Sequence, residues 1–219
     1  MPNFIGTAVL YVVPLLFAVI LHEVAHGWVA EKLGDPTARL LGRITLNPIV
    51  HIDLVGTIIL PGLLLLTGSP FLFGWAKPVP VNFGNLRGGR KDMALVALSG
   101  PLTNFILAAI SSVIFHFTFS NVLDPAGSGR FWYMYLKDPV RQMALISMQF
   151  NLVLMVVNLL PILPLDGGRI VVGLAPLRIA IALEHTERFG MLIVLLLIGS
   201  GMWGYIVSPV IGFFMRFLL

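Results

Sequence analysis

The chain has 219 residues, of which 58% are hydrophobic and only 11% are charged, and its mean hydropathy is +0.95. A soluble domain carries about 25% charged residues, and a fold of this size could not bury so much apolar surface, so the composition excludes a soluble protein and predicts a membrane protein. Cysteine is absent, which excludes disulfides and thiolate metal ligands, and the net charge of +4 is typical of basic membrane loops rather than of nucleic-acid binding.

Four apolar segments are long enough to cross a bilayer as helices: 4–33, 93–119, 140–160 and 189–207. No polar stretch is long enough for a separate soluble domain, so residues 1–219 are expected to form a single membrane domain. The first basic residue, Lys32, follows a long apolar run, and we therefore expect no cleaved signal peptide. These features predict an all-α polytopic helix bundle with about four spans.

The apolar stretch 54–73 is ambiguous, because Pro61 and Gly62 divide it into two short halves. Basic residues lie on both of its sides: Lys32, Arg39 and Arg43 before it, and Lys77, Arg87, Arg90 and Lys91 after it. Basic flanks favour the cytoplasmic side of a membrane, and a single crossing would place one flank outside. We therefore favour a re-entrant hairpin, or a segment packed in the bundle, over a span, and we expect the N-terminus outside.

Two segments beside this stretch have the composition of extended chain. Residues 40–49 include β-branched residues, and residues 75–81 include the run Lys77-Pro-Val-Pro80. Proline excludes a helix or a central strand but permits an edge strand or a loop that lines a site. We expect short extended segments near the functional site, with 40–46 as a candidate edge for a bound peptide, and a polar outer loop at 121–137.

The strongest chemical signal is the run Leu21-His-Glu-Val-Ala-His26 in the first apolar segment. Residues four apart share one face of a helix, so His22 and His26 can bind one zinc ion together. Glu23 is near enough to take a proton from water that zinc has acidified. The alternative is a set of polar residues satisfied inside the bundle. Ionisable groups in a membrane cost about 2.5–3.5 kcal/mol each on insertion scales, so three within five residues need a compensating partner, which a divalent cation supplies.

A catalytic zinc normally has three protein ligands and one open position. The candidate third ligand is Asp166, which follows an apolar span and lies among prolines and glycines in the run Leu-Leu-Pro161-Ile-Leu-Pro-Leu-Asp166-Gly-Gly. These neighbours break the helix and let a carboxylate turn inward. Asp166 could instead cap a new helix that starts at Gly167, a common role for aspartate, and the residues alone leave both interpretations open.

Together these motifs resemble those of the site-2 protease family of intramembrane zinc metalloproteases, in the right order and over nearly the whole chain. The run from His22 to His26 resembles the metal-binding helix of the family. Gly100-Pro-Leu-Thr-Asn104 resembles its central-helix motif, and Asn158-Leu-Leu-Pro161 through Leu165-Asp166-Gly167 resembles the motif of its third zinc ligand. The resemblance implies one zinc ion bound by His22, His26 and Asp166, with Glu23 as the general base.

The resemblance also implies roles for three further residues. Asn104 would lie near the zinc and help to position substrate or stabilise the oxyanion, although chemistry alone makes an amide in a membrane helix more often a helix–helix contact. Asn158 and Pro161 would shape the substrate cleft. The implied activity is hydrolysis of peptide bonds within or near transmembrane segments of partner proteins, as in regulated intramembrane proteolysis. The implied topology makes the metal-binding and central helices antiparallel neighbours, joined on the cytoplasmic side.

The position of the motif predicts its depth. His22 lies about 27 Å along a helix from Phe4 and about 15 Å from Lys32, so the zinc would lie inside the cell membrane but nearer its cytoplasmic face. The expected partners are membrane-spanning protein substrates and the lipid bilayer, and the sequence does not give the oligomeric state. We expect a minimal form of the family, without the inserted peptide-binding domain or the C-terminal nucleotide-sensing domain of some members.

A membrane transporter or metal-ion carrier is the alternative function. In that case His22, Glu23, His26 and Asp166 would line an ion path. The sequence disfavours this function, because it has a single polar cluster rather than a series of sites across the bilayer.

Overall fold

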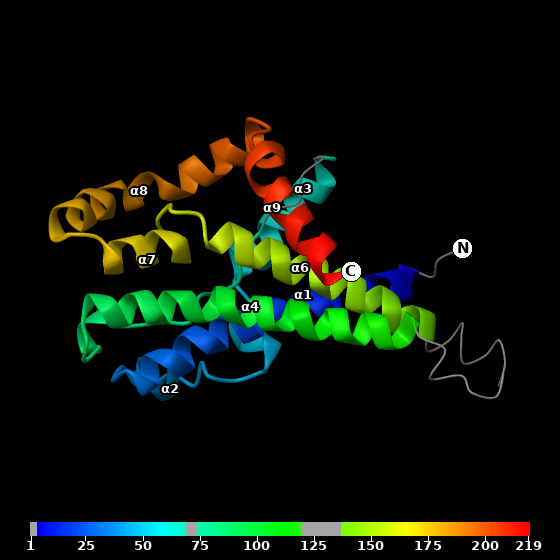
Figure 1. The fold of residues 1–219 in the computed structure, drawn as a ribbon, viewed down its shortest axis with the longest axis horizontal. Coiled ribbons are helices and arrows are strands. Elements are labelled where there is room, and N and C mark those ends of the chain that lie inside the picture. Colours follow the sequence, from blue (N-terminus) through cyan, green and yellow to red (C-terminus); the bar gives the residue numbers. More distant parts are fainter. Residues whose placement is uncertain (1–3, 69–73, 120–136) are drawn as a thin grey trace.

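The computed structural model describes residues 4–68, 74–119 and 137–219. Within these residues the chain forms helices and no β-strand, which confirms the predicted all-α fold. Three long helices form the centre of the bundle: α1 (Phe4–Lys32), α4 (Arg90–Phe119) and α6 (Asp138–Asn158). Each packs against the other two (Figure 1). Each contains an apolar stretch long enough to cross a membrane.

Hydrogen bonds join the chain just after α1 to the chain just before α4. The backbone N–H of Arg87, just before α4, donates to the carbonyl oxygen of Leu33, just after α1, at 3.0 Å. Nearby, the buried carboxylate of Asp35 accepts several hydrogen bonds, from the N–H and hydroxyl of Thr37, the N–H of Asn82 and the amide of Asn85. The two helices are therefore antiparallel neighbours, as the family resemblance implied.

The fourth apolar region is bent rather than straight. The sequence predicted one helix over 189–207, but the structure has α8 (Leu177–Gly199) and α9 (Trp203–Leu218), with a bend of 83° between them. The break falls beside Gly201, whose φ of 76° is a conformation that favours glycine. α9 packs on α6, whereas α8 contacts α7 (Asp166–Leu174), as Figure 1 shows. The predicted single helix is therefore two helices.

The stretch 54–73 forms no membrane-length helix in its described part. η2 (Leu54–Ile59) and α3 (Leu60–Leu66) follow one another, and their apolar helical part, Leu54–Leu64, is shorter than the roughly 20 residues that a crossing needs. The chain then returns to the start of the stretch, because the N–H of Trp75 donates to the carbonyl oxygen of Gly56 at 3.1 Å. Gly56 and Trp75 are thus adjacent, which agrees with the favoured hairpin.

One of the two expected extended segments is contradicted by the structure. Residues 40–49 are not extended, because α2 (Thr37–Leu40) ends there, Gly42 follows in a turn with φ of 64°, and η1 (Pro48–His51) begins. The candidate peptide-binding edge at 40–46 is therefore wrong. Residues 75–81 have neither helical nor strand pairing, as their prolines require, and η3 (Phe83–Asn85) follows them. Residues 69–73, and 121–136 of the expected outer loop, lie outside the described residues.

α7 packs closely on the first half of α4. Arg90 donates hydrogen bonds to the carbonyl oxygens of Val172, at 2.7 Å, and of Ala175 at the end of α7. A Cβ atom at Gly173 would lie 2.6 Å from the carbonyl oxygen of Arg90, so the two backbones are in close contact. A buried cluster that includes Met93 and Val172 fills the space around this contact. The packing fixes α7, and with it Asp166, against the central helices.

Candidate metal centre

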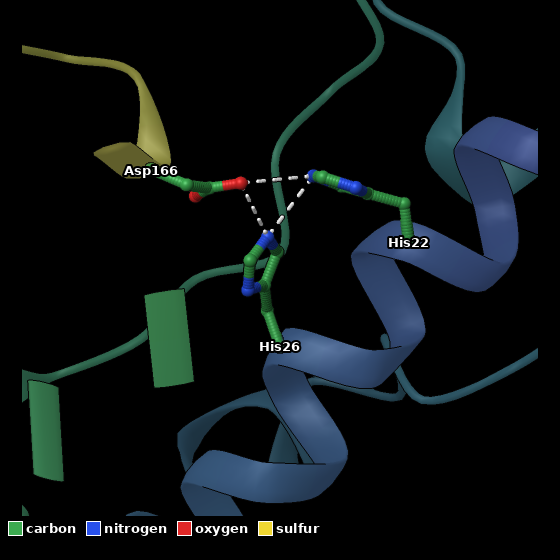
Figure 2. A group of neighbouring side chains, drawn as sticks. All are labelled: His22, His26 and Asp166. Atoms are coloured by element: carbon green, nitrogen blue, oxygen red, sulfur yellow. Dashed lines mark hydrogen bonds and ion pairs between the residues drawn. The ribbon is translucent and has the colours of Figure 1, made fainter. Parts of the chain in front are cut away.

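Three side chains that the sequence singled out meet between α1 and α7 (Figure 2). His22 and His26 lie one turn apart on α1, and Asp166 is the first residue of α7. The Nε2 atoms of the two histidines are 3.1 Å apart, and Oδ2 of Asp166 lies 3.2 and 3.3 Å from them. Within the described residues, this is the only group of three or more His, Asp or Glu side chains whose ligand atoms lie close enough together to hold a metal ion.

The Nδ1 atoms of both imidazoles face hydrogen-bond acceptors. Nδ1 of His26 lies 2.8 Å from the carbonyl oxygen of Val96, and Nδ1 of His22 lies 2.6 Å from Oδ1 of Asn104. A carbonyl oxygen only accepts, and the Asn104 amide is oriented because its Nδ2 donates to the carbonyl oxygen of Ala18. Both Nδ1 atoms therefore carry the proton. In the neutral imidazoles, both Nε2 atoms present lone pairs to the centre.

The charges and ligand atoms of these three side chains fit a bound cation. Two imidazole nitrogens and one carboxylate oxygen face one another, and Oδ2 of Asp166 is buried without a hydrogen-bond donor among the described residues. Ligand atoms about 2.0–2.1 Å from a tetrahedral zinc lie about 3.3–3.4 Å from one another, which agrees with the observed spacing. His and carboxylate ligands are also those of known catalytic zinc sites, which keep a fourth position open. The three residues therefore fit zinc.

Gly100 on α4 makes room for the group. A Cβ atom at this position would lie 2.4 Å from Nε2 of His26 and 2.6 Å from Cε1 of His22. Even one methyl group would therefore enter the space that the two imidazoles share. The glycine that the sequence matched to the central-helix motif thus lies directly against the candidate metal ligands His22 and His26.

The backbone around Asp166 is also closely packed. A Cβ atom at Gly167 would lie 2.3 Å from the carbonyl oxygens of Leu159 and Leu160, so only glycine lets the preceding turn pack on the first turn of α7. The capping interpretation of Asp166 is wrong, because the residue before the helix is Leu165 and no side chain caps its N-terminus. The carboxylate of Asp166 points at the two histidines instead (Figure 2).

Glu23 follows His22 on α1 and has one of its oxygens already bonded. The backbone N–H of Val79 donates to Oε2 of Glu23 at 2.7 Å. Val79 belongs to the segment 75–81, which therefore passes beside the metal centre. The expectation that this segment lies near the site agrees with the structure.

Asn104 is fully buried on α4 and has no donor left for a substrate. Its Nδ2 hydrogens go to the carbonyl oxygen of Ala18, at 3.1 Å, and to Oδ1 of Asn151, at 2.8 Å. Its Oδ1 accepts from Nδ1 of His22. A primary amide has two N–H donors, so in this arrangement Asn104 orients His22 rather than donating to an oxyanion.

Comparison with known proteins identifies the family. Residues 10–199 match the model of peptidase family M50. The chain belongs to peptidase family M50. This finding confirms the resemblance to the site-2 proteases that the three motifs indicated.

Individual relatives of this M50 protein agree with the family match. The Bacillus subtilis (strain 168) protein named "Putative zinc metalloprotease YwhC" is 37% identical over 204 residues, which cover 92% of this chain and 85% of the relative. Rip2 of Mycolicibacterium smegmatis, which carries the same description, is 27% identical over 201 residues, covering 90% and 69%. Rip2 of Mycobacterium tuberculosis (strain H37Rv) is 28% identical over 162 residues, covering 74% and 56%. No solved structure matches the chain significantly.

M50 membership makes the chain a zinc metalloprotease, as predicted. Together with the apolar helices, it also indicates a multi-pass membrane protein. The comparisons give no support to the transporter or carrier alternative. Zinc is thus the metal for which His22, His26 and Asp166 form the candidate site.

Sequence reasoning missed a polar chain that continues behind Asn104 in the M50 fold. Asn151 on α6 accepts from Asn104 and donates through its own Nδ2 to the carbonyl oxygen of Ser147 at 2.8 Å. The hydroxyl of Ser111 on α4 donates to the hydroxyl oxygen of Ser147 at 2.9 Å. Ser147 and Asn151 are four residues apart and so share a face of an apolar helix, a spacing that could have revealed the chain.

Asn158 and Pro161 lie at the end of α6 and in the turn that leads to Asp166. The Nδ2 of Asn158 donates to the carbonyl oxygen of Leu154 within α6, at 3.0 Å, and Pro161 is exposed. Among the described interactions, none joins either residue to the three metal-binding side chains. Their role in shaping a substrate cleft stays a prediction.

Proposed function

We propose that this M50 protease is an intramembrane endopeptidase that hydrolyses peptide bonds within or near the transmembrane segments of other membrane proteins. His22, His26 and Asp166 hold one zinc ion, and Glu23 is the general base. The observation that carries the proposal is the convergence of the two histidine Nε2 atoms and a carboxylate oxygen on one point between apolar helices.

The chemistry follows from the placement of these side chains. When bound, zinc supplies Lewis-acid chemistry, which polarises a carbonyl and acidifies water. Glu23 takes a proton from the attacking water and gives it to the nitrogen of the leaving amine, so its carboxylate is restored at the end of the cycle. The bond from Val79 to Oε2 leaves Oε1 of Glu23 for this proton.

The depth of the site limits its substrates. His22 is about 15 Å along α1 from Lys32, and the basic flanks of the stretch 54–73 favour the cytoplasmic side for that end of the helix. The centre thus lies within the cell membrane, nearer the cytoplasmic face. A substrate helix has to unwind locally there, because a helical backbone hides its carbonyl groups. Membrane-spanning proteins are the proposed partners, and release of their domains is the proposed outcome.

A Glu23→Gln variant tests the proposal. Glutamine keeps the size of the side chain but cannot take the proton, so the variant should bind a full equivalent of zinc and lose cleavage of a membrane-spanning reporter in vesicles. Glu31→Gln is the matched control, because Glu31 lies on the same helix but pairs with Arg39 away from the centre. Undiminished cleavage by Glu23→Gln would remove Glu23 from the mechanism.

The same pair of proteins can be used to identify the substrates. A membrane fraction is incubated with the wild type or with Glu23→Gln, and the fragments are identified by mass spectrometry. The proposal expects fragments, seen with the wild type alone, whose new ends fall in or next to transmembrane segments. Wild-type fragments confined to soluble domains would contradict the intramembrane part of the proposal.

A further inference from the structure

The hydrogen bond between Val79 and Glu23 involves an uncommon donor. In the run Pro78-Val79-Pro80 the two prolines have no N–H. Val79 is therefore the one residue of the three that has a backbone donor, and this donor lies 2.7 Å from Oε2 of Glu23. The prolines also restrict the backbone on both sides of Val79, so the N–H is held in a preset direction.

The segment that carries this N–H is anchored by hydrogen bonds. The buried guanidinium of Arg43 donates through Nη2 to the carbonyl oxygens of Lys77, at 2.8 Å, and Pro78, at 3.2 Å. The N–H of Lys77 donates to the carbonyl oxygen of His51 at 2.9 Å. The segment is thus fixed just before Val79 by contacts that do not involve α1.

The surface of α1 is shaped to admit the segment. Gly27 lies four residues after Glu23 and so on the same face of the helix. A Cβ atom at Gly27 would lie 2.9 Å from Cγ1 of Val79, whose side chain is buried there. Pro78 and Pro80 instead line an open pocket of about 440 Å³, together with Leu41, Arg43 and Lys77. Val79 is therefore the residue that the segment directs at α1.

We propose that the backbone N–H of Val79 is a positioning group for Glu23, and that the segment Lys77–Val81 is built to present it. The inference rests on the proposed function, in which Glu23 is the base. A hydrogen bond to a charged carboxylate is short and strong, and it fixes the orientation of Glu23 before substrate binds. Oε2 is occupied by the segment, and Oε1 is directed at the reacting water.

Replacement of the single N–H tests the inference. The α-hydroxy analogue of valine, introduced at position 79 in the full chain, turns the N–H into an ester oxygen and keeps the side chain. The matched control is the same analogue at Val81, in the same segment, whose N–H does not bond to Glu23. General-base catalysis contributes about 10²–10⁴-fold to rates, so we expect kcat for the reporter to fall roughly tenfold or more in the Val79 ester alone. KM and zinc content should stay at the values of the Val81 ester.

Arg43 provides a second test with ordinary amino acids. Arg43→Met removes both hydrogen bonds to the segment, and Arg43→Lys keeps a donor for one of them. We expect kcat to fall in Arg43→Met at unchanged zinc content, and to recover in part in Arg43→Lys.

The outcomes separate this inference from the proposed function. If Glu23→Gln still cleaves, the proposed function fails and the inference fails with it. If Glu23→Gln is inactive but the Val79 and Val81 esters have equal kcat, only the inference is overturned. A higher kcat in the Val79 ester would mean that the N–H of Val79 hinders Glu23 as a base. Loss of zinc from the Val79 ester would mean that this N–H supports the fold rather than the orientation of Glu23. Either result would overturn the inference.

Discussion

At the residue scale, Asn104 contacts the candidate metal centre through His22. Its Oδ1 accepts from Nδ1 of His22, and its own amide is held by the carbonyl oxygen of Ala18 and by Asn151. A partner of this kind fixes the tautomer and the ring orientation of a metal-binding histidine. The sequence predicted that Asn104 lies near the zinc, but only the contacts reveal that both of its donors are taken.

We expect Asn104→Leu to weaken zinc binding by about 10–100-fold, the usual cost of losing such a partner. The leucine leaves Nδ1 of His22 without an acceptor, so the ring can turn or move its proton. Competition with a zinc chelator measures the affinity. Ser112→Ala on the same helix is the control, because its hydroxyl bonds to the carbonyl oxygen of Leu218. Equal zinc affinity in Asn104→Leu and the wild type would refute the role.

Gly100 supports a second prediction at this scale. A methyl group at position 100 would lie 2.4 Å from Nε2 of His26, which is closer than non-bonded atoms approach. Gly100→Ala should therefore lose both zinc and cleavage. Gly212→Ala should keep both, because a Cβ atom there meets nothing within 4 Å. Zinc content per chain and reporter cleavage check the pair, and a zinc-loaded, active Gly100→Ala would show that the centre is wider than the structure has it.

At the element scale, Asp35 joins the end of α1 to the segment before α4. Burial raises the pKa of this carboxyl. Hydrogen bonds from Thr37, Asn85 and the N–H of Asn82 together lower the pKa by more than burial raises it, so the pKa lies below its ordinary value. A pKa that is lower in the folded state stabilises the fold above the unfolded-state value of about 3.9, and this contribution is lost as the pH falls below it.

Asp35→Asn should therefore destabilise the protein in a pH-dependent way. The amide leaves at least one buried donor without its acceptor, which costs about 1–3 kcal/mol. Thermal unfolding in detergent should show the largest difference between wild type and variant near neutral pH, and a smaller difference below about pH 4. A difference that does not change with pH would mean that Asp35 does not act as a carboxylate.

Two predictions made from the sequence about secondary-structure elements were wrong. Hydropathy found the long helices but joined α8 and α9, because it does not register the backbone of Gly201, which breaks the run. The β-branched residues of 40–49 favoured an extended segment, yet the turn at Gly42 decides the structure. Both errors come from single glycines with positive φ, and composition averaged over a window does not detect them.

At the scale of the whole molecule, the motifs were predictable and their connections were not. His22 and His26 are four residues apart, so helical geometry alone placed them together. Asp166 is 140 residues from His26, and only the packing of α7 on α4 brings it to them. The contact between Val79 and Glu23 and the chain through Asn151 likewise depend on tertiary structure, because each joins segments far apart in the sequence.

The packing of α7 on α4 therefore brings Asp166 to the histidines of α1. The most direct test is the zinc content of purified Asp166→Ala beside the wild type and Asp138→Ala, a control whose aspartate pairs with Arg141 on α6. We predict one zinc per chain in the wild type and the control, and far less in Asp166→Ala. A full equivalent of zinc in Asp166→Ala would contradict the metal centre described here.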